Sequence, residues 1–345
     1  MNVLLVGLGS IGQRHVRNLR HLLGAQVEIS AFRTRKLPRV LTDGFGIEPG
    51  SDVEEKYAIR VFDDLDEALA ERPTIAFICN PSSLHLPAAT AAARAGCHLF
   101  IEKPLSHSWD GVERFVDIVE RSNLVALVGY QMRFHPCLQR LRALLQEKRI
   151  GAVLAVNAEV GEHLPGWHPY EDYRQLYAAR RDLGGGVVLS QIHELDYIYW
   201  LFGPARRVFA LGGHLSRLDL DVEDTASILM ECVIDGRAVP VHLHQDFVQR
   251  PPARTCEVIG DAGKIVLDFH GPILRLFDGS GDLAETYTVD RFQRNQMFLD
   301  QLQHLLACVA GDETPISTVR DGSQSLRIAL AARESMATGQ PVELT

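Results

Sequence analysis

The sequence lacks several features that would define a special class of protein. It has no run of about 18 apolar residues, so no segment is predicted to span a membrane. It has only six cysteines, none in a CxxC pair, which favours reduced core thiols and a cytoplasmic protein over a disulfide framework. Its basic residues are scattered and its formal charge is −9, which argues against nucleic acid or an anionic membrane as the main partner.

What is present predicts two domains. The chain has 345 residues and is 46% hydrophobic, which is enough to bury more than one domain core. The sequence character changes near residue 125, so we expect an N-terminal domain of residues 1–125 and a second domain of residues 126–345. The fold class predicted is α/β: a doubly wound Rossmann sheet, followed by an α+β domain with a large, mostly antiparallel open sheet.

Short apolar segments alternate with helical patterns in the first domain. Nearly continuous apolar runs are typical of parallel strands buried on both faces. The predicted strands are residues 3–6, 27–32, 75–79, 98–101 and 124–128. An alanine-rich helix over residues 83–95 is predicted to end at Gly96.

Successive strand patterns separated by turns predict the second sheet. The predicted strands are residues 152–160, 208–212, 225–234, 237–247, 256–259, 264–269 and 274–277. Asp235-Gly236 predicts a hairpin turn. Helices are predicted near residues 187–202, 292–310 and 319–338, and we expect the first two to cover one face of this sheet.

The other face of the sheet is a candidate contact between subunits. Alternate residues on the two central strands include Ile228, Met230, Val241 and Leu243. If either set is exposed, pairing of two faces would produce a homodimer or homotetramer. The alternative is that both apolar sets are buried within one chain, with polar residues such as His242 outside.

The glycine-rich sequence after the first strand predicts a dinucleotide site. Gly7, Gly9 and Gly12 permit a tight turn, a close approach of the backbone to a pyrophosphate, and close packing of helix on strand. Ser10 and Ile11 open the helix, whose free N–H groups attract phosphate. The alternative is a glycine-rich turn that binds nothing.

The end of the second strand bears on the choice of cofactor. A site selective for NAD usually has an acidic residue here, whereas this chain has Arg33, Thr34, Arg35 and Lys36. Charge-assisted hydrogen bonds from Arg33 and Thr34 to a 2′-phosphate would favour NADP, with NAD as the alternative. A solvated basic loop would explain the same residues.

Polar residues follow two further strands, at the edge where open α/β sheets bind ligands. Asn80 and His85 follow one strand, and Glu102 and Lys103 follow the next, so all four are candidate cofactor-binding residues. The segment CNPSSLHLPAATAAARAGCHLFIEKPLS, taken with GLGSIG, resembles the glucose–fructose oxidoreductase/inositol dehydrogenase (Gfo/Idh/MocA) family. The later GGGVVLSQIHELDYIYWLFG resembles the signature of that family's second domain.

The resemblance implies an oxidoreductase and assigns two catalytic residues. Lys103 would contact both the nicotinamide and the substrate, and its bond to Pro104 is often cis in relatives. His193 matches the family's catalytic histidine. A histidine and a nearby ammonium together suit the loss of a proton from a hydroxyl whose carbon gives up hydride.

One departure from the family pattern affects His193. Relatives usually have an Asp a few residues before the histidine, where this chain has Ser190 or Gln191. Asp196, at i+3 on the same helix face, is a candidate replacement and a candidate substrate contact. Otherwise the proton relay is weakened or changed.

Further substrate contacts are predicted in an aromatic segment, residues 163–174. Aromatic faces stack on sugar rings, and polar tips bind hydroxyls, so Trp167, His168 and Tyr173 are candidates. A subunit contact or a self-packed loop would explain the segment equally. Arg133 and the neighbouring His135 lie near the same expected site.

The function predicted is NAD(P)-dependent hydride transfer to or from the hydroxyl or keto carbon of a sugar, sugar acid or nucleotide sugar. A cofactor-retaining glycoside hydrolase and a non-catalytic sensor are the alternatives. No metal is expected: His242 and His244 share a strand face, but no third ligand is evident.

Overall fold

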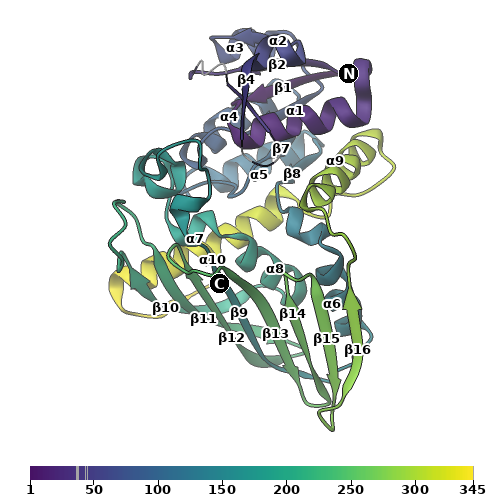
Figure 1. The fold of residues 1–345 in the computed structure, drawn as a ribbon, viewed down its shortest axis with the longest axis vertical. Coiled ribbons are helices and arrows are strands. Elements are labelled where there is room, and N and C mark those ends of the chain that lie inside the picture. Colours follow the sequence, from purple (N-terminus) through teal and green to yellow (C-terminus); the bar gives the residue numbers. More distant parts are fainter. Residues whose placement is uncertain (36–38, 43, 45, 345) are drawn as a thin grey trace.

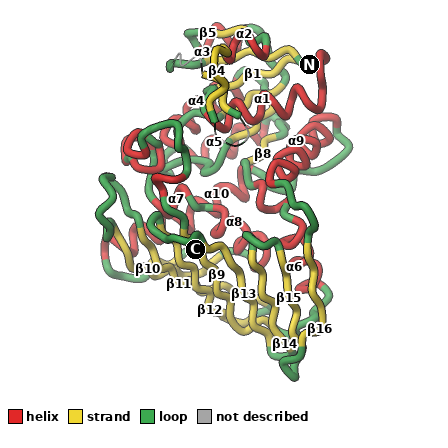
Figure 2. Tube along the Cα trace, in the orientation of Figure 1, coloured by secondary structure: helices red, strands yellow, loops and turns green. Residues whose placement is uncertain are grey.

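The computed structural model describes residues 1–35, 39–42, 44 and 46–344. The N-terminal part of the chain forms a parallel sheet, and the C-terminal part forms a larger open sheet (Figure 1). Long irregular segments lie between the two sheets, as Figure 2 shows. Among the described residues no helix is both long and apolar enough to cross a membrane.

The parallel sheet has the strand order β5-β2-β1-β6-β7-β8. Its strands are β1 Asn2–Val6, β2 Glu28–Phe32, β5 Arg60–Phe62, β6 Ile75–Ile78, β7 His98–Ile101 and β8 Ala126–Val128. Val3 packs into one hydrophobic core and Leu4 into another, because both faces of the sheet are covered. The five predicted strands are confirmed, whereas β5 is not among the predictions, because Arg60–Phe62 begins with a charged residue and forms no continuous apolar run.

Helices connect these strands over both faces of the sheet. They are α1 Ser10–Leu23, α2 Val53–Tyr57, α3 Leu65–Ala70, α4 His85–Arg94 and α5 Val112–Arg121. Gly96 has φ +84°, which suits the predicted stop after α4. A small hairpin, β3 Arg39–Leu41 with β4 Ile47–Asp52, lies beside α1.

The open sheet has the strand order β16-β15-β14-β13-β9-β12-β11-β10-β17, and only β9 and β12 pair in parallel. Its strands are β9 Val153–Gly161, β10 Ala205–Gly213, β11 Thr225–Ile234, β12 Arg237–Asp246, β13 Ala253–Gly260, β14 Gly263–Asp268, β15 Ile273–Asp278, β16 Leu283–Thr288 and β17 Val342–Glu343. Asp235 and Gly236 have φ +48° and +76°, which confirms the predicted hairpin turn.

Helices cover one face of this sheet. They are α6 Pro136–Gln146, α7 Val187–Ser190, α8 His193–Phe202 and α10 Val319–Thr338. Ile228, Met230, Val241 and Leu243 are buried beneath them. The opposite face exposes a different apolar set, which includes Leu211, Leu229 and Val233.

Two of the predicted helices differ from the structure. The expectation that residues 292–310 cover the open sheet is wrong: α9 (Arg294–Ala310) packs on α1, and α10 covers the sheet instead. The helix predicted over residues 187–202 is broken between α7 and α8. The Gln245 side chain donates to the Gln191 carbonyl at 2.7 Å, which occupies an acceptor that a continuous helix would use.

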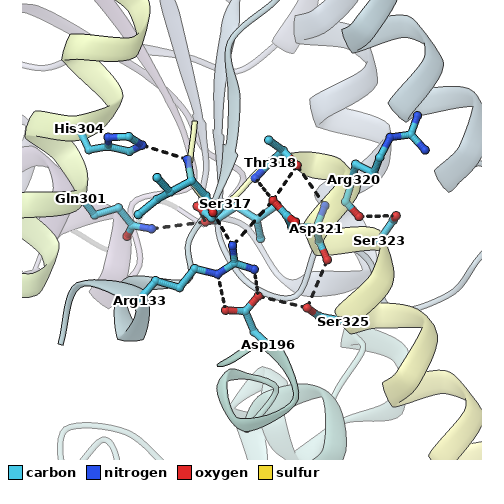
Figure 3. Close-up of polar contacts among 12 residues, drawn as sticks. Arg133, Asp196, Gln301, His304, Ser317, Thr318, Arg320, Asp321, Ser323 and Ser325 are labelled. Atoms are coloured by element: carbon cyan, nitrogen blue, oxygen red, sulfur yellow. Dashed lines mark hydrogen bonds and ion pairs between the residues drawn. The ribbon is translucent and has the colours of Figure 1, made fainter. Parts of the chain in front are cut away.

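A buried ion pair joins the turn that follows the last parallel strand to the helices that cover the open sheet (Figure 3). Arg133, in the 3-10 turn η3 (Gln131–Phe134), donates to both carboxylate oxygens of Asp196 on α8 at 2.9 and 2.7 Å. Ser325 on α10 donates to the same carboxylate at 3.1 Å, and Arg133 also bonds the Ile316 carbonyl. Because Asp196 and Arg133 are almost fully buried, breaking this pair would leave an uncompensated charge.

Candidate active site

The glycines after β1 have different roles in the structure. A Cβ on Gly12 would lie 2.3 Å from the Gly7 carbonyl oxygen, so Gly12 is required by the packing of α1 on the preceding turn. A Cβ on Gly9 would meet no atom of the described residues within 4 Å. In the part of the chain that the structure describes no side chain caps α1, so the N–H groups of its first turn, at Ser10 and Ile11, are available to an anion.

The basic residues after β2 are divided between packing and solvent. Arg33 is buried, and its guanidinium donates to Glu54 at 2.8 Å and to the Arg35 carbonyl at 3.0 and 2.9 Å. Thr34 and Arg35 are exposed. Lys36 lies outside the described residues.

His85 connects the two polar turns at the carboxyl edge of the parallel sheet. One ring nitrogen lies 2.7 Å from the Pro104 carbonyl and the other 2.8 Å from the Asn80 carbonyl. Burial lowers the pKa of His85. The Asn80 side chain donates to Leu84 at 3.1 Å, while its buried carbonyl oxygen Oδ1 has no partner among the described residues.

Glu102 and Lys103 point in different directions. Glu102 lies 2.7 Å from His15 on α1 and is buried against that helix. Lys103 precedes a cis bond to Pro104, and its Nζ donates to the Ser190 carbonyl at 2.8 Å and to the Tyr177 hydroxyl at 3.3 Å. The ammonium group is therefore held at the turn between α7 and α8.

His193 is the first residue of α8 and is buried close to Lys103. Its Nε2 lies 3.0 Å from the amide nitrogen of Gln131, while its Nδ1 has no partner among the described residues. Burial, followed by the positive charges of Lys103, Arg254 and Arg294, holds the pKa of His193 far below its ordinary value. The imidazole is consequently neutral at pH 7.

No carboxylate hydrogen-bonds to His193 within the described part of the chain. Asp196, the candidate replacement, is occupied by Arg133. Gln191 donates to the Asp246 carbonyl at 3.0 Å, and the buried Ser190 hydroxyl has no partner among the described residues. The arrangement differs from a histidine oriented by a carboxylate.

The other predicted substrate contacts have protein partners. Arg133 and Asp196 bond to each other. The Trp167 ring packs edge-on against Phe247 at 5.3 Å. His168 lies 3.1 Å from Glu171, and the Tyr173 hydroxyl accepts from the Asp219 N–H at 3.0 Å.

Sequence reasoning does not identify two residues that the structure places here, Tyr177 and Gln131. Tyr177 contacts Lys103, and Gln131 contacts His193. The glycine triplet contains the signal for Tyr177: a Cβ on Gly185 would lie 2.3 Å from the Tyr177 carbonyl oxygen. Nothing in the sequence near Gln131 points to His193, since 62 residues separate them.

Comparison with known proteins identifies the family. Residues 1–130 match the oxidoreductase family with an NAD-binding Rossmann fold, and residues 138–266 match the GFO/IDH/MocA C-terminal domain. The chain belongs to the Gfo/Idh/MocA family. It is an oxidoreductase, and the family resemblance seen in the sequence is confirmed.

Curated relatives cover the whole chain at low identity. The chain is 26% identical to myo-inositol 2-dehydrogenase from Thermotoga maritima, over 100% of this chain and 98% of the relative. It is 25% identical to the scyllo-inositol 2-dehydrogenase (NAD(+)) of Bacillus subtilis, over 99% and 95%.

Solved structures share the fold over the full length. Levoglucosan dehydrogenase in complex with NADH has a TM-score of 0.84 at 17% identity, covering 100% of this chain and 99% of the other. The WlbA dehydrogenase from Bordetella pertussis, in complex with NADH and UDP-GlcNAcA, has a TM-score of 0.79 at 21% identity, covering 100% and 99%.

The two glycines give a matched pair of substitutions for the dinucleotide site. We expect Gly9→Ala to leave the free energy of unfolding unchanged but to weaken NADH and NADPH binding by about tenfold or more, because its methyl group would occupy space open to a ligand. We expect Gly12→Ala to lower the free energy of unfolding by about 1–3 kcal/mol through overpacking. Urea unfolding and fluorescence titration measure the two effects. Unchanged nucleotide affinity in Gly9→Ala would contradict the assignment.

Proposed function

We propose that the protein transfers a hydride between a nicotinamide cofactor and the hydroxyl or keto carbon of a sugar, sugar acid or nucleotide sugar. The observation that carries this proposal is the position of the Lys103 ammonium, held beside His193 at the carboxyl edge of the parallel sheet. The substrate class is taken from the names of the relatives, which act on inositols and on levoglucosan or are solved with a nucleotide sugar.

The residues present fit a dinucleotide. The open space at Gly9 and the first-turn N–H groups of α1 suit the pyrophosphate. Asn80, whose Oδ1 has no partner among the described residues, follows β6 at the same edge of the sheet. When bound, the nicotinamide supplies the hydride acceptor or donor. His85 and Glu102 act indirectly, because their side chains fix the turns that carry Asn80 and Lys103.

Lys103 and His193 have different roles in this proposal. The Lys103 ammonium stabilises negative charge on the substrate oxygen and supplies a proton to that oxygen in the reducing direction; in the oxidising direction the neutral Lys103 amine takes the same proton from the hydroxyl. His193 is neutral, so it orients the substrate by hydrogen bonding instead of storing a proton. Gln131 donates to its Nε2, which leaves the proton on Nδ1, the atom without a partner among the described residues.

We further propose a preference for NADP. Arg35 and Thr34 are exposed at the end of β2, and the Arg35 side chain has no ion pair with the described residues. Arg33 is instead a packing residue, since its donors are used by Glu54 and the Arg35 carbonyl. We therefore propose Arg35, in place of Arg33, as the residue that contacts the 2′-phosphate.

The six buried free cysteines support a cytoplasmic location.

The outer face of the open sheet is proposed to pair with a second subunit. Leu211, Leu229 and Val233 are about half exposed or more on neighbouring strands β10 and β11. Apolar side chains gathered on an open sheet face favour association. Two such faces related by a twofold axis would give a dimer, and two dimers a tetramer.

The function is tested by incubating the protein with NADP or NAD and a panel of substrates that includes myo-inositol, levoglucosan and UDP-GlcNAc. We expect net reduction of the cofactor with at least one sugar. We expect Lys103→Met to lower kcat/KM by about 10²- to 10⁴-fold, because it removes the charge at the reacting oxygen. His193→Gln should lower kcat/KM by a smaller factor, since one neutral side chain replaces another.

Circular dichroism and nucleotide titration serve as controls for folding and binding in both variants. A Lys103→Met enzyme with a near-normal rate would remove Lys103 from the mechanism. Release of sugar without net cofactor reduction would indicate a glycoside hydrolase, and nucleotide binding without any turnover would indicate a sensor.

Cofactor preference is tested by titrating NADH and NADPH. We expect tighter binding of NADPH than of NADH. We expect Arg35→Ala to reduce the ratio of the two affinities by about tenfold, because one charged hydrogen bond to the phosphate is lost. Arg33→Ala should instead lower stability, measured by urea unfolding, because it removes the partner of Glu54. Equal affinities in the unmodified protein would refute the preference.

Assembly is tested by light scattering on a size-exclusion peak. We expect a mass at least twice the 38.4 kDa of one chain at micromolar concentration. Leu229→Asp should increase the monomer fraction, because it places a charge in the paired face. Leu215→Asp is the matched control, since Leu215 is 68% exposed but lies outside the strands. A monomeric unmodified protein would rule out the pairing.

A further inference from the structure

Residues 163–175, here called the strap, cross from the open sheet to the parallel-sheet part of the chain. They follow β9 and contain only two short 3-10 turns, η4 (Leu164–Gly166) and η5 (Tyr173–Gln175). In Figure 1 the irregular teal part of the chain that includes them lies between the two sheets. The sequence suggests substrate contact here, but the strap's contacts point to another role.

Both ends of the strap are fixed on the C-terminal half of the chain. At one end the Leu164 N–H donates to the Phe247 carbonyl at 3.0 Å, and the Trp167 ring packs on Phe247 at 5.3 Å. At the other end the Tyr173 hydroxyl accepts from the Asp219 N–H at 3.0 Å. Residues 168–172, here called the apex, lie between these two anchors, which limit how far they can move.

The apex bonds to Arg39 of β3. The Arg39 Nη2 donates to Glu171 at 2.9 Å, and its guanidinium carbon lies 4.8 Å from the centre of the Tyr170 ring. Both charged side chains are about three-quarters buried, at 26% and 22% exposure, which makes the pair stronger than an open surface ion pair. His168 stacks on Tyr170 at 5.2 Å and lies 3.1 Å from Glu171, so the apex is internally ordered.

Arg39 is itself attached to the helix that follows the glycine loop. The Gln13 side chain donates to the Arg39 carbonyl at 3.0 Å and accepts from the Leu41 N–H at 2.8 Å. Arg17 donates to the Leu41 carbonyl at 2.8 Å. Since Gln13 and Arg17 belong to α1, the contact between Arg39 and Glu171 connects the strap to the helix whose N-terminus would bind the pyrophosphate.

Tyr170 also reaches the start of that helix. Burial raises the pKa of Tyr170 to about 12, and the Ser10 side chain close to it opposes the shift. Ser10 is the first residue of α1 and follows Gly9, where the structure leaves open space. The strap is therefore joined through Arg39 to α1, the helix whose first turn forms the phosphate end of the predicted dinucleotide site.

We propose that the strap is part of the dinucleotide site and retains the cofactor, which leaves only after the contact between Arg39 and Glu171 opens. The proposal rests on the dinucleotide site of the proposed function. Arg39, attached to α1 through Gln13, holds Glu171 and Tyr170 against the part of the chain that would bind the nucleotide, so the apex obstructs its departure. A residue pair remote from the reacting atoms thus controls exchange of the cofactor.

The rate of cofactor release tests the proposal without a substrate. The full-length protein is loaded with NADPH, and in parallel with NADH, and excess oxidised cofactor is added. Loss of energy transfer from tryptophan to the reduced nicotinamide then reports dissociation. We expect Glu171→Gln and Arg39→Gln each to increase the dissociation rate constant by about tenfold, the effect of losing one charge-assisted bond.

Asp172→Asn is the matched control, because Asp172 lies next to Glu171 in the strap but pairs with the exposed Arg174. It should release the cofactor at the unmodified rate. The Arg39→Gln/Glu171→Gln double variant should be no faster than either single variant, because both remove the same contact.

The outcomes distinguish failure of the strap proposal from failure of the proposed function. If neither nucleotide binds the unmodified protein, the dinucleotide site fails, and the strap proposal fails with it. If a nucleotide binds but Glu171→Gln and Arg39→Gln leave its release unchanged, only the strap proposal is overturned. Equal acceleration by Asp172→Asn, or additive effects in the double variant, would also overturn it. Should one single variant fail to fold, as judged by circular dichroism, the other decides the question.

Discussion

The geometry of the site depends on the buried ion pair between Arg133 and Asp196. A carboxylate without solvent requires a partner in fixed geometry, and Arg133 meets both of its oxygens at 2.9 and 2.7 Å. The pair fixes the turn that carries Gln131 against the helix that carries His193. Gln131 then reaches His193 at 3.0 Å. Two residues that the sequence suggests as substrate contacts thus bond to each other and bring Gln131 and His193 together.

Much of the fold can be predicted from the sequence, because local patterns determine its elements. The parallel strands other than β5 and the Asp235-Gly236 hairpin follow from apolar runs and turn residues. The glycine loop and Lys103 lie close after two of these strands. Strands β5 and β17 cannot be found this way, because neither Arg60–Phe62 nor Val342–Glu343 is a continuous apolar run.

The roles of charged residues are harder to predict, because they depend on partners far away in the chain. Arg33 resembles a phosphate ligand until Glu54 is seen beside it, 21 residues later. The helical spacing of Asp196 suggests a partner for His193. In the structure, however, Asp196 bonds to Arg133, which is 63 residues away in the sequence. A side chain that can bond to protein or ligand is assigned correctly only when its competing partners are known. Sequence spacing does not reveal those competitors.

The glycines show the same limit of sequence reasoning, because their roles also depend on what surrounds them. Gly9 and Gly185 both belong to glycine-rich turns beside the site, but a Cβ on Gly9 would meet nothing within 4 Å, whereas one on Gly185 would lie 2.3 Å from the Tyr177 carbonyl. The first glycine leaves room for a ligand, and the second lets the chain pack so closely that Tyr177 reaches Lys103. A glycine-rich motif therefore indicates close approach of a backbone. Whether the approaching group is a phosphate or another part of the protein depends on what fills the space of the missing side chain.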